Sequence, residues 1–388
     1  MTDHHVIVIG AGYAGCMAAN RLQATGAARV TLIDPHPQFV ERIRLHQLAA
    51  GTGAATLDFA TLLHAGITRV QAAVTRIDGP ARRVVLDGDG DGDGDGDGER
   101  SLTYDALIYA VGSGTGSSSV PGVAEFADRV GDADEAQRLA DRLAGAPRDA
   151  AIVVVGGGLT GVEVAAEMAQ VRPHGSVTLV AGGGLVPTAG ASGARSVARR
   201  LRRLGVDVVD GTTASEVSDS KVTLADGRTL AADITVWTTG FGVPPLARDS
   251  GLATDDSGRL RVDDHLVSVS DPRIVGAGDA VVVDSIDLRM SCQAALPLGA
   301  QAAGTVTALL DGTPPRRVDQ GFAAQCIGLG RDGGTVVLTD RSDRPRRVHI
   351  GGRAGGLVKE QVCRMTVRWI AGEGRKGGSY SWTRGLRR

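Results

Sequence analysis

The sequence predicts an α/β fold because one local pattern occurs twice along the chain. The first copy is ValIleValIleGlyAlaGlyTyrAlaGly at 6–15, and the second is IleValValValGlyGlyGlyLeuThrGly at 152–161. In each copy a β-branched run leads through Gly-x-Gly-x-x-Gly into an alanine-rich helical stretch. Further strand patterns follow each copy in the same order, at 29–34 and 105–113, and at 176–181 and 233–241. This repetition predicts two Rossmann-like units.

The glycine turns predict two dinucleotide-binding sites. A helix that begins at such a turn offers unpaired N–H groups and the positive end of its dipole to a pyrophosphate. Glycines let the backbone approach the phosphates without a Cβ in the way. Two turns, each between a strand and a helix, are a specific signal, whereas a lone one is weak. The predicted sites are Gly10, Gly12 and Gly15 in the first copy, and Gly156, Gly158 and Gly161 in the second.

The residue that ends the second strand differs between the copies. Asp34 stands where a carboxylate would bind an adenosine ribose, whereas Ala181 stands at the matching place in the second copy. The usual residue for NADH preference is therefore missing, and Gly182–Gly184 leave room beside it. Downstream arginines could meet a 2′-phosphate, but their helical pattern favours solvent exposure. They are Arg195, Arg199 and Arg200.

Composition and charge exclude several classes of protein. The 388 residues suggest two or three domains, and an apolar fraction of 42% excludes a largely disordered chain. A net charge of −2 and only 3% aromatic residues argue against a nucleic-acid partner. No apolar run reaches the ~18 residues that span a bilayer. The stretch 6–19 lacks the basic start of a signal peptide, so we expect a cytoplasmic protein.

An acidic low-complexity tract interrupts the first unit. Residues 87–98 are six consecutive Asp-Gly pairs, which predict a solvated loop. The flanking segments 82–86 and 101–104 read as strands, so the tract should form a hairpin tip. A calcium site is the alternative, but the tract lacks the spacing of a calcium loop. The four cysteines are also too dispersed for a zinc site, and we expect no metal.

At this point the sequence resembles the FAD-dependent pyridine nucleotide-disulfide oxidoreductase superfamily, and within it the type II NADH dehydrogenase-like flavoproteins. The segment 106–113 looks like the end of the first lobe of the FAD domain. The segment 273–280 looks like the second FAD signature, in which Asp279 would hold the ribityl chain. The turn at 156–163 looks like the nicotinamide-domain turn with its glutamate, Glu163.

The resemblance implies a glutathione-reductase-like layout in which one nucleotide domain is inserted into the other. Residues 1–113 and 242–310 would bind FAD, and residues 114–241 would bind NAD(P)H. Residues 311–388 would form a small α+β domain that covers the flavin side or makes a dimer contact. A homodimer is the habit of the family.

The resemblance also implies the site residues. Glu163 and Gln293 would be the catalytic positions, with Glu163 orienting the nicotinamide beside the flavin. The implied cofactor-binding positions are Gly10, Gly12, Tyr13, Ala14, Gly15, Asp34, Pro35, Arg44, Val74, Ala110, Gly112, Asp279, Gln293, Ala294, Gly156, Gly158, Leu159, Thr160, Gly161, Glu163 and Gly240. Arg44 is chosen because a guanidinium suits a phosphate or a flavin carbonyl. His46 is either a proton donor or, as we favour, a satisfied polar residue.

Two departures from the family pattern bear on the electron acceptor. The first helix carries only Cys16 in place of the Cys-x-x-x-x-Cys pair of disulfide reductases, which excludes that dithiol chemistry. Cys292 and Cys326 could meet over a flavin, but a small buried apolar role for Cys292 is favoured. In the quinone-lining segment of type II NADH dehydrogenases, two glutamines are replaced here by Pro297 and Leu298.

The C-terminal segment is basic and carries an apolar stripe. Residues 353–388 hold nine basic and two acidic side chains. Val358, Val362, Met365 and Trp369 fall on one helical face, flanked by Lys359, Arg364 and Arg368. Such a helix can lie on an anionic membrane. The stripe is narrow, so an ordinary core or dimer face is favoured over peripheral membrane contact.

These observations predict an FAD-dependent NAD(P)H oxidoreductase. Hydride would pass from NAD(P)H to FAD, and electrons would continue to a quinone or a small organic acceptor. One alternative is a reductase specific for a metabolite or for a ferredoxin-type protein. Another is a non-catalytic redox sensor of the apoptosis-inducing-factor type. Turnover separates these classes, because a sensor's flavin would not be reoxidised quickly.

Overall fold

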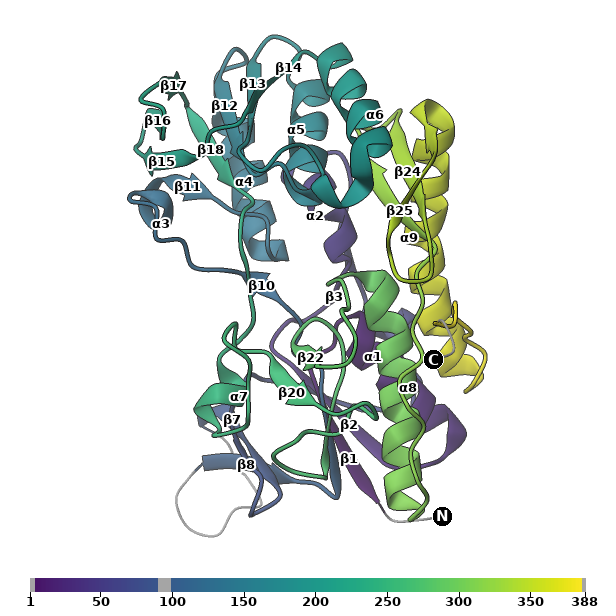
Figure 1. The fold of residues 1–388 in the computed structure, drawn as a ribbon. Coiled ribbons are helices and arrows are strands. Elements are labelled where there is room, and N and C mark those ends of the chain that lie inside the picture. The colour runs from purple at the N-terminus through teal and green to yellow at the C-terminus, as the bar shows by residue number, and fades with distance from the viewer. Residues whose placement is uncertain (1–3, 90–98, 386–388) are drawn as a thin grey trace.

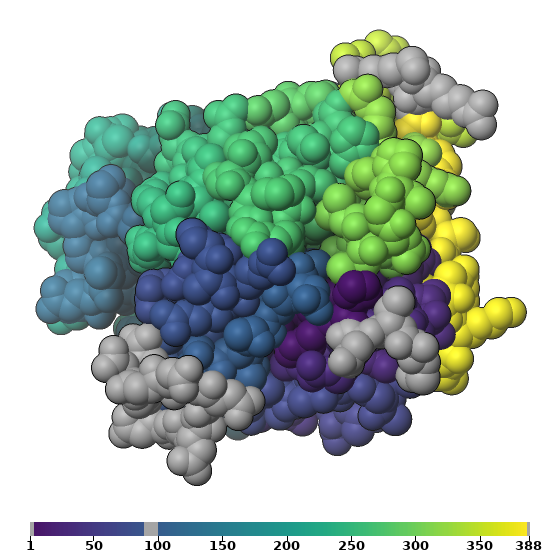
Figure 2. All heavy atoms as spheres, turned by 90° about the horizontal axis from the view of Figure 1, so that it is seen from below, coloured from purple at the N-terminus to yellow at the C-terminus, as the bar shows by residue number. Residues whose placement is uncertain are grey.

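The computed structural model describes residues 4–89 and 99–385. Its first unit is a parallel five-stranded sheet in the order β21-β9-β1-β2-β5. The strands are β1 (His5–Ile9), β2 (Arg29–Asp34), β5 (Thr68–Gln71), β9 (Ala106–Tyr109) and β21 (Ile274–Gly276), and helix α1 (Tyr13–Thr25) follows β1. Because β21 comes from a distant part of the chain, two separate stretches build this unit. Figure 2 shows the green later segment packed against the purple and blue N-terminal segments.

The second unit repeats the plan of the first. Its parallel sheet has the order β11-β18-β12-β13-β14. The strands are β11 (Ala127–Asp128), β12 (Ala151–Val155), β13 (Ser176–Ala181), β14 (Val206–Asp210) and β18 (Ile234–Trp237). The helices are α4 (Ala133–Gly145), α5 (Leu159–Val171) and α6 (Gly190–Arg203). The predicted α/β class with two Rossmann-like units is confirmed.

The chain crosses between the units twice, side by side. Strand β10 (Gly114–Thr115) pairs antiparallel with β19 (Phe241–Gly242), and the two form a short ribbon between the sheets (Figure 1). The domain boundaries predicted after residues 113 and 241 fall at this ribbon. As boundaries of independently folding domains they stay a prediction.

Smaller elements complete both units. They are β3 (Phe39–Val40), η1 (Arg42–Arg44), α2 (Leu45–Ala49), β4 (Thr56–Leu57), η2 (Phe59–Thr61), β6 (Val74–Asp78), β7 (Arg83–Asp89), β8 (Glu99–Thr103), α3 (Val123–Phe126), η3 (Pro187–Ala189), β15 (Ala214–Val217), β16 (Lys221–Leu224), β17 (Thr229–Ala231), α7 (Leu246–Asp249), β20 (Leu260–Val262) and β22 (Val281–Val283). Strands β7 and β8 pair antiparallel, as the predicted hairpin requires. Most of the Asp-Gly tract, residues 90–98, lies outside the described residues, so the loop and calcium alternatives stay predictions.

The C-terminal segment joins both units. Helix α8 (Cys292–Leu310) packs on α1, and a sheet of β23 (Ala324–Gly328), β24 (Gly334–Thr339) and β25 (Pro345–Gly351) leads into α9 (Gly352–Arg375). One sheet face meets α6, where Ser192 Oγ lies 2.8 Å from His349 Nδ1. The other face meets α9, which also packs on α1. Figure 1 shows α9 running alongside both units.

The predicted apolar stripe of α9 lies at the edge of its buried face. Val358 and Met365 remain 36% and 37% exposed, whereas Cys363, Thr366 and Ile370 are buried. Within the described residues, no helix is long and apolar enough to cross a membrane. Membrane contact and homodimer formation both stay predictions.

A buried ion pair fastens the end of α9 to the first unit. The side chain of Glu373 is fully buried, and its Oε1 lies 2.5 Å from Nε of Arg21 on α1. Its carboxylate also accepts the backbone N–H groups of Gly378 and Tyr380, at 2.6 and 2.7 Å. Burial opposes ionisation, but Arg21 and the two N–H groups outweigh it, so the pKa of Glu373 lies below its usual range.

We therefore predict that Glu373→Gln lowers the free energy of unfolding by about 3 kcal/mol at pH 7, because Arg21 loses its partner in the interior. A carboxyl with a lowered pKa stabilises the fold above its unfolded pKa, and this contribution disappears as pH falls through the folded value. The Tm difference between wild type and variant should therefore shrink toward pH 4. The control is Asp226→Asn in the exposed Asp226–Arg228 pair, which should leave Tm unchanged. Equal Tm values for wild type and Glu373→Gln at pH 7 would contradict the prediction.

Candidate functional site

The first glycine turn is shaped to receive a phosphate at the start of α1. Gly10 has φ +96°, and a Cβ there would lie 2.3 Å from the carbonyl oxygen of Ala110. A Cβ at Gly15 would lie 1.8 Å from the carbonyl oxygen of Gly10. Gly12 precedes the helix with no side-chain cap, and a Cβ there would meet nothing within 4 Å. The first N–H groups of α1 therefore face an open position, which suits a pyrophosphate.

The second turn has the same geometry. Gly156 has φ +131°, and a Cβ at Gly161 would lie 1.9 Å from the carbonyl oxygen of Gly156. Gly158 precedes α5 with φ −72° and ψ −176°, close to the −78° and −166° of Gly12. The predicted residues Leu159 and Thr160 form the first positions of α5. Both turns therefore have the backbone that a dinucleotide site requires.

Asp34 lies on the first turn, as the sequence comparison of the copies suggested. Its Oδ2 accepts the N–H of Ala11 at 2.6 Å, and its Oδ1 accepts the N–H of His36 at 2.9 Å. The hydrogen bond that Asp34 Oδ1 accepts from the His36 imidazole raises the pKa of His36. Pro35 separates these two residues at the end of β2. Ala181, at the end of β13, is completely buried and offers no oxygen from its side chain.

Several of the remaining predicted FAD residues lie around the N-terminus of α1, and their contact with a cofactor stays a prediction. Asp279, which follows β21, accepts a hydrogen bond from Ser113 Oγ at 2.8 Å. A Cβ at Gly278 would lie 3.1 Å from Cβ of Ala14, so the turn before Asp279 sits against the start of α1. Tyr13 is buried, and its ring centroid lies 5.2 Å from that of Phe39 in an edge-to-face arrangement. Other predicted positions lie in the surrounding elements: Ala110 and Gly112 after β9, Val74 at the start of β6, and Gly240 before the second crossing.

The structure separates the roles of two nearby arginines. Nη1 and Nη2 of Arg44 donate to Glu360 at 2.9 and 3.0 Å, and Glu41 lies 3.2 Å from its Nε. Its guanidinium thus holds α9, and its predicted contact with a cofactor stays a prediction. Arg42 forms no hydrogen bond or ion pair among the described residues. Burial lowers the pKa of Arg42, and the nearby carboxylate of Asp279 opposes that effect.

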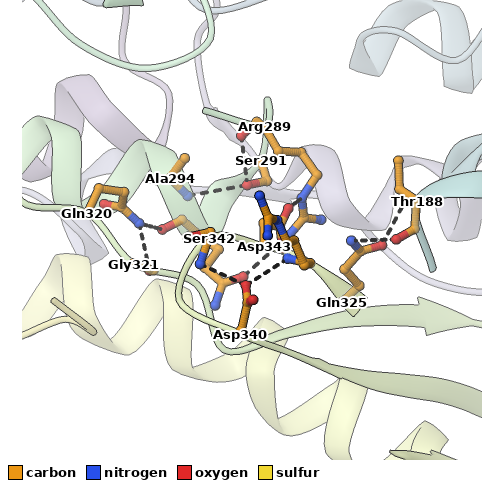
Figure 3. Close-up of polar contacts among 12 residues, drawn as sticks. Thr188, Arg289, Ser291, Ala294, Gln320, Gly321, Gln325, Asp340, Ser342 and Asp343 are labelled. Carbon is orange, nitrogen blue, oxygen red and sulfur yellow. Dashed lines mark hydrogen bonds and ion pairs between the residues drawn. The ribbon is translucent and has the colours of Figure 1, made fainter. Parts of the chain in front are cut away.

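The N-terminus of α8 is held by residues of the chain that follows this helix. Ser291 caps the helix, with its Oγ accepting the N–H of Ala294 at 3.3 Å. Arg289 binds Asp343 at 2.5 Å, and Asp343 lies in a turn where Asp340 accepts the N–H of Ser342 (Figure 3). Because Pro297 has no N–H, the carbonyl of Gln293 lacks its usual helical partner. Gln320 supplies one, donating from Nε2 to Gln293 O at 3.3 Å.

Gln293 itself is occupied by backbone contacts. With its amide nitrogen toward the carbonyl of Ala324 at 2.9 Å, its oxygen accepts the N–H of Ala323 at 3.2 Å. These contacts tie α8 to the start of β23. A catalytic role for Gln293 stays a prediction, and the observed contacts give it a positioning role.

Glu163 belongs to a buried polar cluster that joins three parts of the chain. Its Oε1 lies 3.0 Å from Nζ of Lys359 on α9 and accepts the N–H of Gly328 on β23 at 2.7 Å. Its Oε2 lies 3.7 Å from Nδ1 of His46 on α2. A Cβ at Gly328 would lie 3.3 Å from Oε1, so the strand approaches the carboxylate closely. The second unit, the first unit and the C-terminal segment thus meet at one carboxylate.

Electrostatics fix the charges of this cluster. Burial would raise the pKa of Glu163, but the Lys359 ammonium and the Gly328 N–H hold it below its usual range. Burial likewise opposes the charge of Lys359, yet Glu163 raises the pKa of Lys359 well above its ordinary value. Burial lowers the pKa of His46 to about 4, aided by Lys359 and Arg44 and opposed by Glu163. At pH 7 the cluster is therefore an ionised Glu163–Lys359 pair beside a neutral imidazole.

Sequence reasoning missed two residues of this site. Lys359 was predicted only to flank the apolar stripe of α9, but its side chain is 14% exposed, contacts Glu163 and follows the buried Gly355 on the stripe that continues to Cys363. The spacing 355, 359, 363 was a visible signal, because it follows the buried stripe of a helix. Arg42 had no distinguishing signal, since Arg44 is the same residue type two positions later.

All four cysteines are free among the described residues, and Cys16 Sγ donates to the carbonyl of Ala11 at 3.1 Å. Cys292, Cys326 and Cys363 lie close enough to raise one another's pKa, so a pairing of Cys292 with Cys326 stays a prediction. Burial raises the pKa of Cys292 and of Cys363 to about 11, so both stay protonated at pH 7. No cluster of three or more potential metal ligands occurs in the described part of the chain.

Comparisons with known proteins agree with this geometry. The family model of pyridine nucleotide-disulphide oxidoreductases matches residues 4–300. The NADH dehydrogenase-like protein Rv1812c of Mycobacterium tuberculosis is 33% identical over 328 residues, which are 76% of this chain and 78% of that protein. The type II NADH:quinone oxidoreductase Ndh of the same organism is 26% identical over 80% of this chain and 74% of its own.

Solved structures share the fold. NDH2 from Plasmodium falciparum in complex with NADH superimposes with a TM-score of 0.77 at 15% identity, covering 96% of this chain and 97% of that one. The sulfide:quinone oxidoreductase of Aquifex aeolicus has a TM-score of 0.78 at 17% identity, over 96% and 92% of the two chains. With two matched dinucleotide turns and these similarities, the chain belongs to the pyridine nucleotide-disulphide oxidoreductase family and is an FAD-dependent NAD(P)H oxidoreductase of the NADH dehydrogenase-like type.

Proposed function

We propose that the protein oxidises NAD(P)H at the second unit and delivers the electrons to a quinone through FAD in the first. The Glu163–Lys359 pair carries this proposal, because it places an ionised acid and a buried cation where both units and the C-terminal segment meet. Type II NADH:quinone oxidoreductase Ndh and a demethylphylloquinone reductase of Synechocystis are relatives, at 26% identity each. Their acceptors support a quinone here.

The residues of the first unit fit FAD. The open N-terminus of α1 suits its pyrophosphate, Asp279 can accept from its ribityl hydroxyls, and Asp34 can accept from its adenosine ribose. Arg42 is the cation that the described residues leave without a partner near Asp279. We assign it to the pyrophosphate. When bound, the flavin accepts two electrons as hydride and returns them to the acceptor.

The protein's own groups supply orientation and electrostatic stabilisation. Glu163 stands two residues after the last glycine of the nucleotide turn, so it can orient the nicotinamide end of NAD(P)H. Reduction of a quinone builds up negative charge on its oxygens, and the Lys359 ammonium, which contacts Glu163 and the carbonyl of Cys326, is a cation that can stabilise such charge. Glu163 holds that ammonium in place through its 3.0 Å contact. Because His46 is neutral at pH 7, it adds no second positive charge beside the Glu163 carboxylate.

Acceptor turnover tests the proposal directly. The flavin band of the purified holoprotein is followed anaerobically by stopped flow with NADH and NADPH, and reoxidation is then measured with a menaquinone analogue, a ferredoxin and oxygen. We expect fast bleaching by nicotinamide nucleotide and fastest reoxidation by the quinone. Faster reoxidation by ferredoxin would replace the quinone, and slow reoxidation by every acceptor would favour the redox sensor.

Arg42→Met should weaken FAD binding by about 10- to 100-fold, the worth of a charge-assisted contact of about 1.5–3 kcal/mol. The dissociation constant is measured by flavin fluorescence during reconstitution of the apoprotein. Arg44→Met is the matched control, because its guanidinium is already bound to Glu360 and Glu41. That variant should have a lower Tm and an unchanged affinity for FAD. Loss of FAD affinity in Arg44→Met alone would instead support Arg44 as the residue that contacts the cofactor.

Lys359→Met should slow reoxidation of the flavin by the quinone about 100-fold, the lower end of what one electrostatic contact to a developing negative charge contributes. Reduction by NADH should change less. Because the single change leaves Glu163 charged and buried without its cation, it should also lower Tm. The double variant Lys359→Met/Glu163→Gln removes both charges and should recover Tm without recovering reoxidation. Recovery of both would show that Lys359 acts on stability alone.

A further inference from the structure

We infer that the second unit binds NADH and NADPH with similar affinity, and that Gly183 is the position at which a single side chain would decide between them. The inference rests on the proposed nucleotide site at the Gly156–Gly161 turn. The two cofactors differ only in a phosphate at the 2′-position of the adenosine ribose. In this fold that position is read where the second strand of the unit ends.

Comparison of the two units shows that the second lacks a carboxylate at the end of its second strand. In the first, the carboxylate of Asp34 accepts the N–H of Ala11 at 2.6 Å and so stands over the turn. In the second, Ala181 takes that place and its Cβ would lie 2.8 Å from a Cβ on Gly157. A carboxylate here would accept the 2′-hydroxyl of NADH and repel the phosphate of NADPH. Its absence removes both effects.

No cation replaces the missing carboxylate. Residues 181–186 are Ala-Gly-Gly-Gly-Leu-Val and residues 211–215 are Gly-Thr-Thr-Ala-Ser, so both neighbouring loops lack charged side chains. The charged side chains that border these loops are Asp210, an exposed carboxylate beside Ala181 in the sheet register that accepts the N–H of Gly211 at 2.9 Å, and Arg228, which binds Asp226 at 2.8 Å. A 2′-phosphate therefore meets no cation in these two loops, and Asp210 repels it only weakly because the exposed carboxylate is screened by water and salt.

The arginines of α6 lie elsewhere. Nε of Arg200 donates to the carbonyl of Leu329 at 3.2 Å, which commits it to the C-terminal segment. Arg195 and Arg199 are exposed and begin more than one turn into the helix. The N-terminus of α6 faces β25 through the contact of Ser192 with His349.

Of the glycines beside Ala181, Gly183 has room for a side chain. A Cβ at Gly182 would lie 2.5 Å from Cγ2 of Thr213, and a Cβ at Gly157 would lie 2.3 Å from the carbonyl oxygen of Gly184. Neither position can take a side chain without movement. Gly183 is exposed, a Cβ there would meet nothing within 4 Å, and its φ is not in the left-handed region. Substitution at this position should therefore leave the fold unchanged.

Binding of two unreactive probes tests the inference on the FAD-loaded protein. Isothermal titration calorimetry with ADP-ribose and 2′-phospho-ADP-ribose gives a dissociation constant for each, independently of turnover. For wild type we expect the two constants to agree within tenfold and the ratio to change little with salt. Preference for either probe by more than 100-fold would overturn the inference.

Three variants at one position provide the controls. Gly183→Arg should favour 2′-phospho-ADP-ribose at least tenfold over the wild-type ratio, and this gain should fall with salt. Gly183→Asp should shift the ratio at least tenfold the other way, and Gly183→Ser should leave it unchanged. Equal ratios in all three variants would show that Gly183 does not face the 2′-position.

Failure of the inference can be told from failure of the proposed function. If one probe binds and the other does not, the nucleotide site exists and only the inferred lack of discrimination is wrong. If neither probe binds, the second turn is not a nucleotide site, and both the inference and NAD(P)H oxidation at this unit are wrong. Binding of both probes with no flavin reduction would leave the inference standing and contradict the proposed function.

Discussion

The architecture depends on one buried carboxylate. Glu163 projects from the nucleotide-binding helix of the second unit and meets Lys359 from the C-terminal helix, Gly328 from the C-terminal sheet and His46 from the first unit. An isolated charge at this depth would be too costly to retain, so each partner compensates part of its desolvation. The relative position of three chain segments is therefore tied to a single ionised group, and so is the geometry between the two nucleotide turns.

This constraint explains why α9 is long and why it is fastened at both ends. Near its beginning, Lys359 contacts Glu163, and Glu360 binds Arg44 of the first unit. Near its end, Glu373 binds Arg21 of α1. The apolar clusters alone would resist rotation of the units weakly, because hydrophobic contact has no preferred direction. Directional polar contacts at several points along one helix supply the missing orientation.

The sequence predicted features that depend on neighbouring residues, but it did not predict contacts between residues distant in the chain. The glycine turns, the helices that follow them and the position of Asp34 depend on neighbouring residues, and the structure shows each as expected. Arg42 and Arg44 differ only in their partners, which come from residues distant in the sequence. Lys359 was predicted only as a neighbour of the apolar stripe of α9, because its buried partner Glu163 lies almost two hundred positions away. Pairing of charges across a fold leaves no periodic signal in either segment.

The altered quinone segment can be understood from packing. Pro297 and Leu298 are buried in α8, and at the next residue a Cβ on Gly299 would lie 2.1 Å from the carbonyl oxygen of Ala14. Glutamines at a crossing this close would need polar partners that the apolar surroundings do not supply. The helix uses Gln320 to satisfy the carbonyl that Pro297 leaves free, so the replacement is integrated with the C-terminal segment. The replaced positions thus serve the packing of α8 on α1, and the polar side chains at the start of the helix, Ser291 and Gln293, are both held by backbone contacts.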